Sequence, residues 1–337
     1  MTPILELRNV VKEFPVTATT LSLRSSPTVS AVADVSLEVQ AGETFGLVGE
    51  SGCGKTTLSR MIVGLERPTA GEIWFEGNDV TRRVGRDRLT RARAMQLMFQ
   101  DPHSSLDPRM AVGSTLQEPL DIHRVGSRKD RRERVRQLLD EVGLDPQAAD
   151  RFPHEFSGGQ RQRIGLARAL ALEPRLLIAD EPVSALDVSV RAQILNLMNG
   201  MKKRYALTLV LISHDLSVIR YLADRVGVMY LGKLVEIGPI DSIFQHPAMP
   251  YTATLLGAIP VPEPKVERRR VKFVASGEPP SPVSPPSGCR YRTRCDRAQA
   301  LCAEVEPPLR PMATGQIAAC HFPLQAPAEL EPATAAH

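Results

Sequence analysis

The octapeptide Gly-Glu-Ser-Gly-Cys-Gly-Lys-Thr at residues 49–56 constrains this chain more than any other feature. The apolar segment Phe45–Val48 precedes it, and a helix-like segment from about Thr56 to Gly64 follows. Glycines let a loop between a strand and a helix surround phosphate groups with backbone N–H donors, and the helix N-terminus favours anions. A chance match would be a plain glycine-rich turn. Because a strand and a helix flank the motif, the pattern predicts a phosphate-binding loop in an α/β fold.

The chemistry of such a loop predicts what its side chains do. We expect Lys55 to reach the β- and γ-phosphates of a nucleoside triphosphate, and the Thr56 hydroxyl to bind Mg²⁺. The other loop residues expected at the phosphates are Gly49, Ser51, Gly52, Cys53, Gly54 and Thr57.

Two adjacent carboxylates follow a second apolar strand. The segment Leu176–Ala179 leads directly into Asp180 and Glu181. In an open α/β sheet, ligands bind at the carboxyl ends of the strands. We therefore expect Asp180 to hold Mg²⁺, directly or through water, and Glu181 to polarise an attacking water as a general base. Alone, such a strand end would be structural; with the glycine-rich loop it becomes the expected partner.

Strand-like and helix-like segments alternate along the chain. This alternation predicts a mainly parallel sheet with covering helices. The N-terminal segment Leu5–Val39 has the pattern of strands, with an irregular Thr- and Ser-rich insert at Val16–Val29. Between residues 101 and 156 the pattern is helical, including a helix at 131–142 that ends at Gly143. Further strands are expected at 73–77, 95–99, 208–212 and 226–230, and further helices at 159–172, 190–201 and 216–222.

Composition restricts where the chain works. No stretch of 18 or more apolar residues occurs, so no segment is expected to span a bilayer. Met1–Val11 alternates apolar and polar residues like a strand rather than a signal peptide, which favours the cytosol. The net charge is +4, and basic residues gather at 82–93 and 124–136. Acidic residues are interspersed there, so solvated helix faces are favoured over a nucleic-acid or membrane-surface patch.

Three further elements narrow the class of protein. Ser157-Gly-Gly-Gln-Arg opens the helix before the acidic strand, Gln100 ends a strand, and His214 follows another. In this order and spacing, residues 1 to about 245 resemble the ABC ATPase family. The resemblance implies that Gln100 is the Q-loop residue and contacts Mg²⁺. It also implies that residues 184–187 form the D-loop and that His214 is the switch histidine, although a lone histidine would more simply be a core residue.

The same resemblance implies the fold. It is an α/β P-loop NTPase ABC ATPase core within residues 1–259. This core has a RecA-like mixed sheet, an antiparallel β subdomain and an α-helical signature subdomain at about 101–172. Phe14, at the end of the first strand, would stack on adenine, but a core or edge phenylalanine is the competing interpretation.

The resemblance also implies how two subunits share one reaction. Catalysis is expected from Lys55, Gln100, Glu181 and His214. The signature motif is expected at Ser157, Gly158, Gly159 and Gln160, at a helix N-terminus that favours anions. In a head-to-tail dimer, the signature of one subunit would cap the ATP bound by the other.

Several longer segments are similar to the ATPase subunits of dipeptide/oligopeptide importers. These segments are residues 99–110, 179–191, 246–252 and 277–282. The resemblance implies an ATP-hydrolysing subunit, of the second or F-type paralogue, that powers import of di-/oligopeptides or related small solutes. Its expected partners are the paralogous ATPase in a heterodimer, two membrane permeases and, indirectly, a substrate-binding protein, at the cytoplasmic face of the membrane.

Two alternatives compete with this importer hypothesis. A soluble ABC ATPase acting on nucleic acid or ribosomes usually carries two cassettes or a long coiled-coil insert, and neither is present here. The expectation is therefore no nucleic-acid partner. A non-hydrolysing nucleotide switch is disfavoured by the intact Lys55, Asp180, Glu181 and His214.

Four cysteines mark a proline-rich C-terminal extension, expected at residues 260–323 and followed by a disordered tail at 324–337. They are Cys289, Cys295, Cys302 and Cys320. Four thiolates suit a [4Fe–4S] cluster or a structural zinc ion. The spacing of these cysteines matches neither the compact cysteine run of ferredoxins nor the Cys-x2-Cys pairs of zinc ribbons. The family resemblance favours [4Fe–4S], with zinc as the alternative and free thiols or a labile disulfide remaining open. The expected role is to staple a segment that lacks a core of its own.

Overall fold

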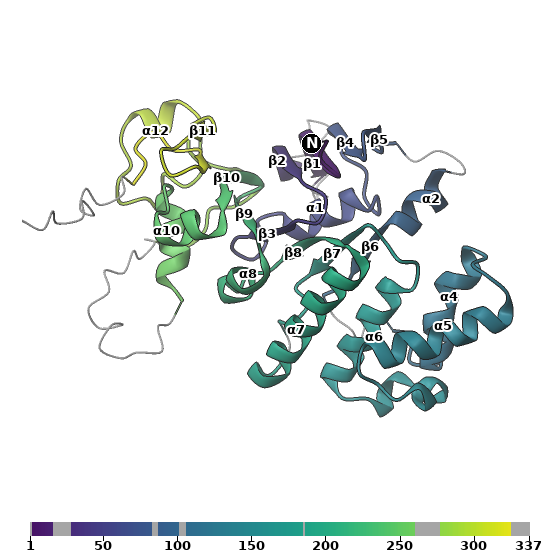
Figure 1. The fold of residues 1–337 in the computed structure, drawn as a ribbon. Coiled ribbons are helices and arrows are strands. Elements are labelled where there is room, and N and C mark those ends of the chain that lie inside the picture. Colours follow the sequence, from purple (N-terminus) through teal and green to yellow (C-terminus); the bar gives the residue numbers. More distant parts are fainter. Residues whose placement is uncertain are drawn as a thin grey trace, which may run out of the picture.

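The computed structural model describes residues 2–15, 28–82, 87–100, 106–184, 186–259 and 277–324. Two sheets lie at the centre, with a helical region on one side and a small C-terminal lobe on the other (Figure 1). Most of the predicted insert, part of the proline-rich segment and nearly all of the predicted tail fall outside these ranges.

The smaller sheet is entirely antiparallel and comes from the N-terminal part of the chain. Its strand order is β2-β1-β4-β5. Leu5 and Leu7 of the first strand are buried, because alternate side chains face the core, and Val10 is buried beyond a register shift that follows Leu7. The expected antiparallel subdomain is therefore present. The strands are β1 (Leu5–Pro15), β2 (Thr28–Val39), β4 (Ala70–Phe75) and β5 (Asn78–Asp79).

The larger sheet has a parallel centre and an antiparallel margin. Its order is β11-β12-β10-β9-β3-β8-β7-β6, and β6, β7, β8, β3 and β9 run parallel. Every residue of β3, β7 and β8 is buried, as expected for parallel strands covered on both faces. The strands are β3 (Thr44–Val48), β6 (Met95–Met98), β7 (Leu176–Asp180), β8 (Thr208–Ile212), β9 (Arg225–Tyr230), β10 (Lys233–Pro239), β11 (Arg310–Pro311) and β12 (Ile317–Ala318).

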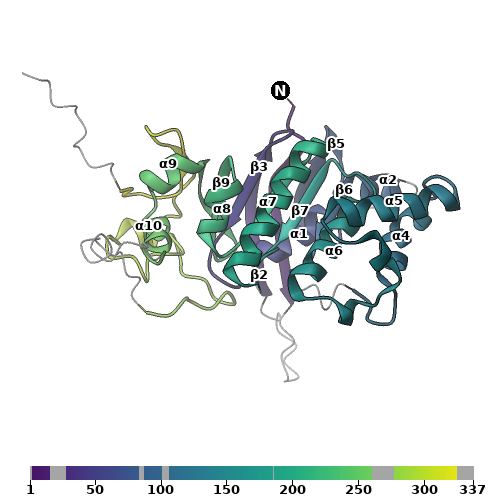
Figure 2. The same ribbon diagram turned by 60° about the horizontal axis from the view of Figure 1, so that its bottom comes forward.

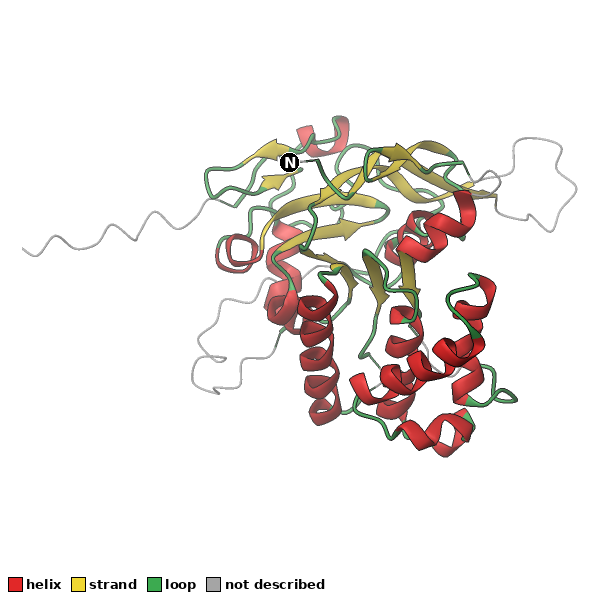
Figure 3. Ribbon diagram, turned by 45° about the vertical axis from the view of Figure 1, so that its right-hand side comes forward, coloured by secondary structure: helices red, strands yellow, loops and turns green. Residues whose placement is uncertain are grey.

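Helices cover the larger sheet on both faces. Helix α1 (Lys55–Ile62) buries Leu58 and Met61 in the core shared by the two sheets. Helices α7 (Val188–Tyr205) and α8 (Leu216–Leu222) pack in the core on the opposite face. Figure 2 shows α7 in front of the strands and α1 behind them, and Figure 3 shows most helices gathered on one side of the strands.

The helical region contains two well-capped helices. Ser127 caps α5 (Arg128–Glu141) in a capping box with Asp130, so the helix begins three residues earlier than the apolar pattern predicts. Ser157 caps α6 (Gly158–Leu170) in the same way with Gln160. The remaining helices are α2 (Asp87–Ala94), α4 (Val112–Ile122), α9 (Ile240–Gln245), α10 (Pro250–Gly257), α12 (Leu301–Glu304) and the 3₁₀ turns η1 (Pro146–Asp150) and η2 (Pro153–Glu155).

Within the described ranges, no helix has the length and apolar character needed to cross a membrane.

The C-terminal lobe is joined to the larger sheet. Strand β12 pairs with β10, with Ala318 opposite Glu236 and Ile317 opposite Ile237. Tyr291 of the lobe is buried between the rings of two core tyrosines. The lobe therefore shares a sheet and an aromatic cluster with the rest of the chain.

Candidate active site

The glycine-rich loop joins β3 to α1, as the sequence predicts. Gly54 has a φ of 107°, and a Cβ there would lie 2.1 Å from the carbonyl oxygen of Ala31, so only glycine fits. Lys55 is 5% exposed, and its ammonium donates to the carbonyl oxygens of Gly49 at 2.8 Å and Glu50 at 3.0 Å. The loop therefore encloses a buried positive charge.

The other loop residues surround this lysine. Ser51 and Gly52 are exposed, while Cys53 is buried with its Sγ 3.5 Å from the lysine ammonium. Thr56 and Thr57 lie half-buried in the first turn of α1. The loop thus has an exposed tip at Ser51 and Gly52 and leads directly into α1.

Asp180 ends β7 beside this helix. Burial raises the pKa of its carboxyl, and a hydrogen bond with the Thr56 side chain acts against that rise. Its Oδ2 accepts from the Ser59 hydroxyl at 3.5 Å, while Oδ1 is buried and has no hydrogen-bond partner in the described part of the chain. A buried carboxylate oxygen without a partner, next to a threonine hydroxyl, fits the oxygen ligands that Mg²⁺ prefers.

Glu181 is held in an unusual conformation at the following position. Its φ is 48°, in the left-handed region that costs energy for a residue with a side chain. Its N–H donates to the carbonyl of Ile212 at 2.9 Å. His214 Nδ1 lies 2.9 Å from Oε1, and Gln100 Nε2 donates to Oε2 at 3.3 Å. Three predicted catalytic residues therefore meet at one carboxylate.

The predicted signature residues lie at the start of α6. Ser157 and Gln160 satisfy each other's backbone N–H groups, at 2.9 and 3.3 Å. A Cβ on Gly159 would lie 2.4 Å from Val190, so the missing side chain lets α6 approach α7 closely. Among the residues with described positions, no hydrogen bond or ion pair links 157–160 to the loop at 49–56. Within the part of the chain that the structure describes, the two motifs are therefore not joined by polar contacts.

Phe14 is exposed at the end of β1. The residue is 37% exposed, and the ammonium of Lys12 lies 4.7 Å from the centroid of its ring. This exposure excludes a core phenylalanine, whereas an edge phenylalanine stays the competing interpretation. A surface position at a strand end leaves the predicted stacking on adenine a prediction.

The four C-terminal cysteines lie close to one another but do not form a single-ion site. Cys289 donates its N–H to the carbonyl of Cys302 at 2.8 Å. Burial, together with the three neighbouring thiols, raises the pKa of Cys320 to about 11, so these thiols lie close enough to interact electrostatically. No three His, Cys, Asp or Glu side chains in the described ranges are arranged to hold a metal ion. The structure gives no support to the predicted [4Fe–4S] cluster or to the zinc alternative.

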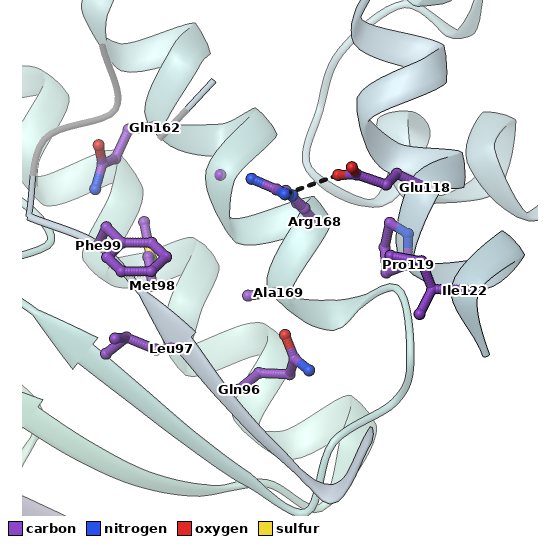
Figure 4. A pocket seen from close by; sticks show the side chains of 11 residues that line it. Gln96, Leu97, Met98, Phe99, Glu118, Pro119, Ile122, Gln162, Arg168 and Ala169 are labelled. Atoms are coloured by element: carbon purple, nitrogen blue, oxygen red, sulfur yellow. Dashed lines mark hydrogen bonds and ion pairs between the residues drawn. The ribbon is translucent and has the colours of Figure 1, made fainter. Parts of the chain in front are cut away.

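A groove beside the site was not predicted from the sequence. It runs between β6, α4 and α6 and is lined by 11 residues, with the apolar side chains of Phe99 and Ile122 43% and 59% exposed (Figure 4). Arg168 and Glu118 form an ion pair of 2.9 Å across it. Because β6 ends at Met98 and Phe99 lines the groove, the groove lies next to Gln100, the residue that contacts Glu181.

This fold and this arrangement define the P-loop nucleoside triphosphatases as the class of protein. Comparisons with known proteins refine the assignment. A family model described as ABC transporter matches residues 32–184. A second, described as oligopeptide/dipeptide transporter, C-terminal region, matches residues 235–302.

Similar proteins agree with both models. The putative oligopeptide transport ATP-binding protein YkfD of Bacillus subtilis (strain 168) is 48% identical over 296 residues, covering 88% of this chain and 90% of that protein. Oligopeptide transport ATP-binding protein AppF of the same organism is 47% identical over 321 residues, covering 95% of this chain and 97% of that protein. This chain belongs to the ABC transporter family and is one of its ATPases.

Solved structures support the fold. The ATP-binding cassette MJ0796, solved as a dimer in a post-hydrolysis state with ADP and Pi, is 28% identical with a TM-score of 0.61, over 70% of this chain and 98% of that chain. The structure of cbiO1 from Clostridium perfringens has a TM-score of 0.62 at 24% identity, over 72% of this chain and 91% of that chain, and shows the fold alone.

Proposed function

We propose that this chain is the ATP-hydrolysing subunit of an importer for dipeptides or oligopeptides. The observation that carries the hydrolytic part is Glu181, strained at the end of β7 and contacted by both Gln100 and His214. The peptide cargo is supported by the names of the relatives and by the match of residues 235–302 to an oligopeptide/dipeptide transporter region.

The loop and the strand end divide the work of hydrolysis. Lys55 and the loop N–H groups would bind the phosphates, and Thr56, Asp180 and Gln100 would hold Mg²⁺. The metal ion would neutralise charge on the phosphate oxygens. Glu181 would accept a proton from the attacking water, with His214 fixing the orientation of its carboxylate.

The site is completed by a second subunit. The signature residues 157–160 are at a helix N-terminus, which favours anions, but they make no hydrogen bond or ion pair to the described loop of their own chain. In a head-to-tail dimer they would reach the γ-phosphate bound by the partner. ATP then favours the closed dimer and hydrolysis favours the open one. We assign the partner as a paralogous ATPase.

The groove of Figure 4 is the proposed docking site for a permease helix. Exposed Phe99 and Ile122 offer apolar anchors, and the Arg168–Glu118 pair offers polar contacts. Since β6 leads from this groove to Gln100, a helix seated there is placed to influence the contact with Glu181. Two permeases, fed by a substrate-binding protein, would position the ATPase dimer at the cytoplasmic face of the membrane.

A [4Fe–4S] cluster at the four C-terminal cysteines stays part of the proposal without any role in hydrolysis. Its support is the presence of four cysteines between residues 289 and 320, together with the resemblance of the chain to the importer ATPases. The thiolates around a [4Fe–4S] cluster lie farther apart than the thiolates around one zinc ion. In the described ranges no side chains are arranged to hold a single metal ion, and this finding therefore argues against zinc more than against the cluster. Phe14 remains the proposed adenine-stacking residue.

The proposal is tested by reconstitution. This chain, its partner ATPase and both permeases are placed in lipid vesicles, and ATP hydrolysis is measured after adding the substrate-binding protein. We expect stimulation by the peptide-loaded binding protein and none in a Lys55→Ala complex. Stimulation of the chain by ribosomes or RNA, without permeases, would instead support the nucleic-acid alternative.

A further inference from the structure

The C-terminal lobe contributes one side chain to the phosphate-binding loop. Arg294 Nη1 donates to both carboxylate oxygens of Glu50, at 3.0 and 2.8 Å. Arg294 is 8% exposed, and Glu50 is the second residue of the loop. A buried guanidinium stays charged and needs a charged partner. The ion pair therefore fixes the positions of both side chains relative to each other.

Glu50 is also held through its backbone. Its N–H donates to the phenol oxygen of Tyr251 at 2.9 Å, and its carbonyl accepts from the Lys55 ammonium at 3.0 Å. Its side chain, N–H and C=O thus each have a partner. The position of Glu50 therefore affects the position of the lysine expected at the phosphates.

A cluster of three tyrosines supports the pair from behind. Tyr291, three residues before Arg294, packs edge-on against Tyr230 and at 5.3 Å against Tyr251. The N–H of Arg294 donates to the carbonyl of Tyr291 at 3.0 Å, which fixes the arginine relative to the ring. The same aromatic cluster therefore orients both groups that hold Glu50, Arg294 from the lobe and Tyr251 from α10.

The charge of the pair matters because of what the loop binds. A carboxylate in this loop would lie near the triphosphate that the loop is expected to hold. The negative carboxylate and the negative phosphate groups would then repel each other at short range. Arg294 cancels that charge and keeps the carboxylate turned toward the lobe.

We propose that Arg294 is a positioning residue of the ATP site, supplied by the C-terminal lobe, which neutralises and orients Glu50. The ATP site is then incomplete without the lobe. The proposal rests on ATP binding at Lys55 and is independent of the cargo and of the partner subunits.

The test compares four variants in the assembled transporter. In Arg294→Gln we expect KM for ATP to rise about tenfold, the usual effect of losing a hydrogen bond to a charged group, with kcat within about twofold of wild type. Because one nitrogen, Nη1, makes both contacts with the carboxylate, the ammonium of Arg294→Lys can replace it, and KM should stay within about threefold of wild type. The double variant Glu50→Gln/Arg294→Gln removes both charges and should recover most of the lost affinity.

The matched control is Arg292→Gln. Arg292 lies in the same segment, but its guanidinium donates to Ser287 within the lobe, so KM should not change. An equal rise of KM in the control, or no recovery in the double variant, would mean that the pair only stabilises the lobe and would overturn the proposal. An unchanged KM in Arg294→Gln would do the same while leaving the ATPase assignment intact. If Arg294→Gln does not fold, the lysine and double variants decide, since both must retain a near-wild-type KM.

Discussion

His214 Nδ1 lies 2.9 Å from Oε1 of Glu181, although the two residues follow different strands. Strands β7 and β8 pair in parallel with Asp180 opposite Ile212, so one carboxylate and one imidazole emerge side by side at the same sheet edge. The N–H of Glu181 donates to the Ile212 carbonyl, which ties its left-handed backbone to that register. The sheet therefore positions the base and the residue that orients it.

Replacing the base tests the central assignment. In Glu181→Gln the amide cannot accept a proton, so ATP hydrolysis should slow at least about 100-fold, while ATP binding is retained. The measurement is phosphate release together with equilibrium nucleotide binding. Glu173→Gln is the matched control, because Glu173 also has a positive φ (51°) but pairs with Arg134 at the surface, away from the site. Wild-type turnover in Glu181→Gln would refute the role.

Removing the histidine should reduce hydrolysis through the same carboxylate. We expect His214→Ala to lower kcat about tenfold to a hundredfold, with KM for ATP nearly unchanged, because the imidazole contacts Glu181 rather than the phosphate loop. Residues that act as a unit are not additive. The double variant with Glu181→Gln should therefore be no slower than Glu181→Gln alone, and an additive loss would show that His214 acts independently.

Glu236 anchors the lobe through a fully buried carboxylate. It accepts from the N–H groups of Ala248 and Met249 and from the side chain of Gln316, which precedes β12. Replacing it by glutamine puts an amide against a backbone donor. We expect Glu236→Gln to lower the free energy of unfolding by about 2 kcal/mol. Glu306→Gln, which alters an ion pair with Lys233 at a more exposed carboxylate, should change it by less than about 1 kcal/mol.

The same residue predicts a pH dependence. Burial raises the pKa of Glu236 above its ordinary value of about 4.3, so the folded chain binds this proton more tightly than the unfolded chain. Its contribution to stability is full below the unfolded pKa and is lost as pH rises through the folded pKa. The difference in the free energy of unfolding between wild type and Glu236→Gln, measured by urea unfolding, should therefore become smaller as pH increases from about 4. A difference that grows with pH would show that folding lowers the pKa of Glu236 instead.

The cysteines offer a spectroscopic test. If they hold a [4Fe–4S] cluster, protein purified without oxygen should be brown and absorb near about 400 nm, with iron and sulfide present. Cys302→Ser should lose the colour, whereas Cys53→Ser should keep it, because Cys53 lies in the phosphate loop. Colourless wild-type protein without iron would contradict the cluster.

Much of the fold could be predicted because its signals are local. The apolar runs of β3, β7 and β8 are short and wholly buried, and both the glycine-rich loop and the Ser157–Gln160 capping box act within a few residues. The sequence does not predict strand β10, because the signal for this strand is not local. Its centre carries Glu236, and a buried carboxylate is tolerated only because tertiary partners satisfy it.

The sequence by itself determined the chemistry of the site: which residues can surround phosphates, hold Mg²⁺ and accept a proton. Only the tertiary structure decided which side chains hold that chemistry in place. Arg294 and Glu50 are 244 positions apart, and they meet because the lobe adds β12 to β10 and buries Tyr291 beside Tyr251. A short motif can encode a reactive group, whereas contacts between distant segments depend on strand pairing and packing that no local pattern records.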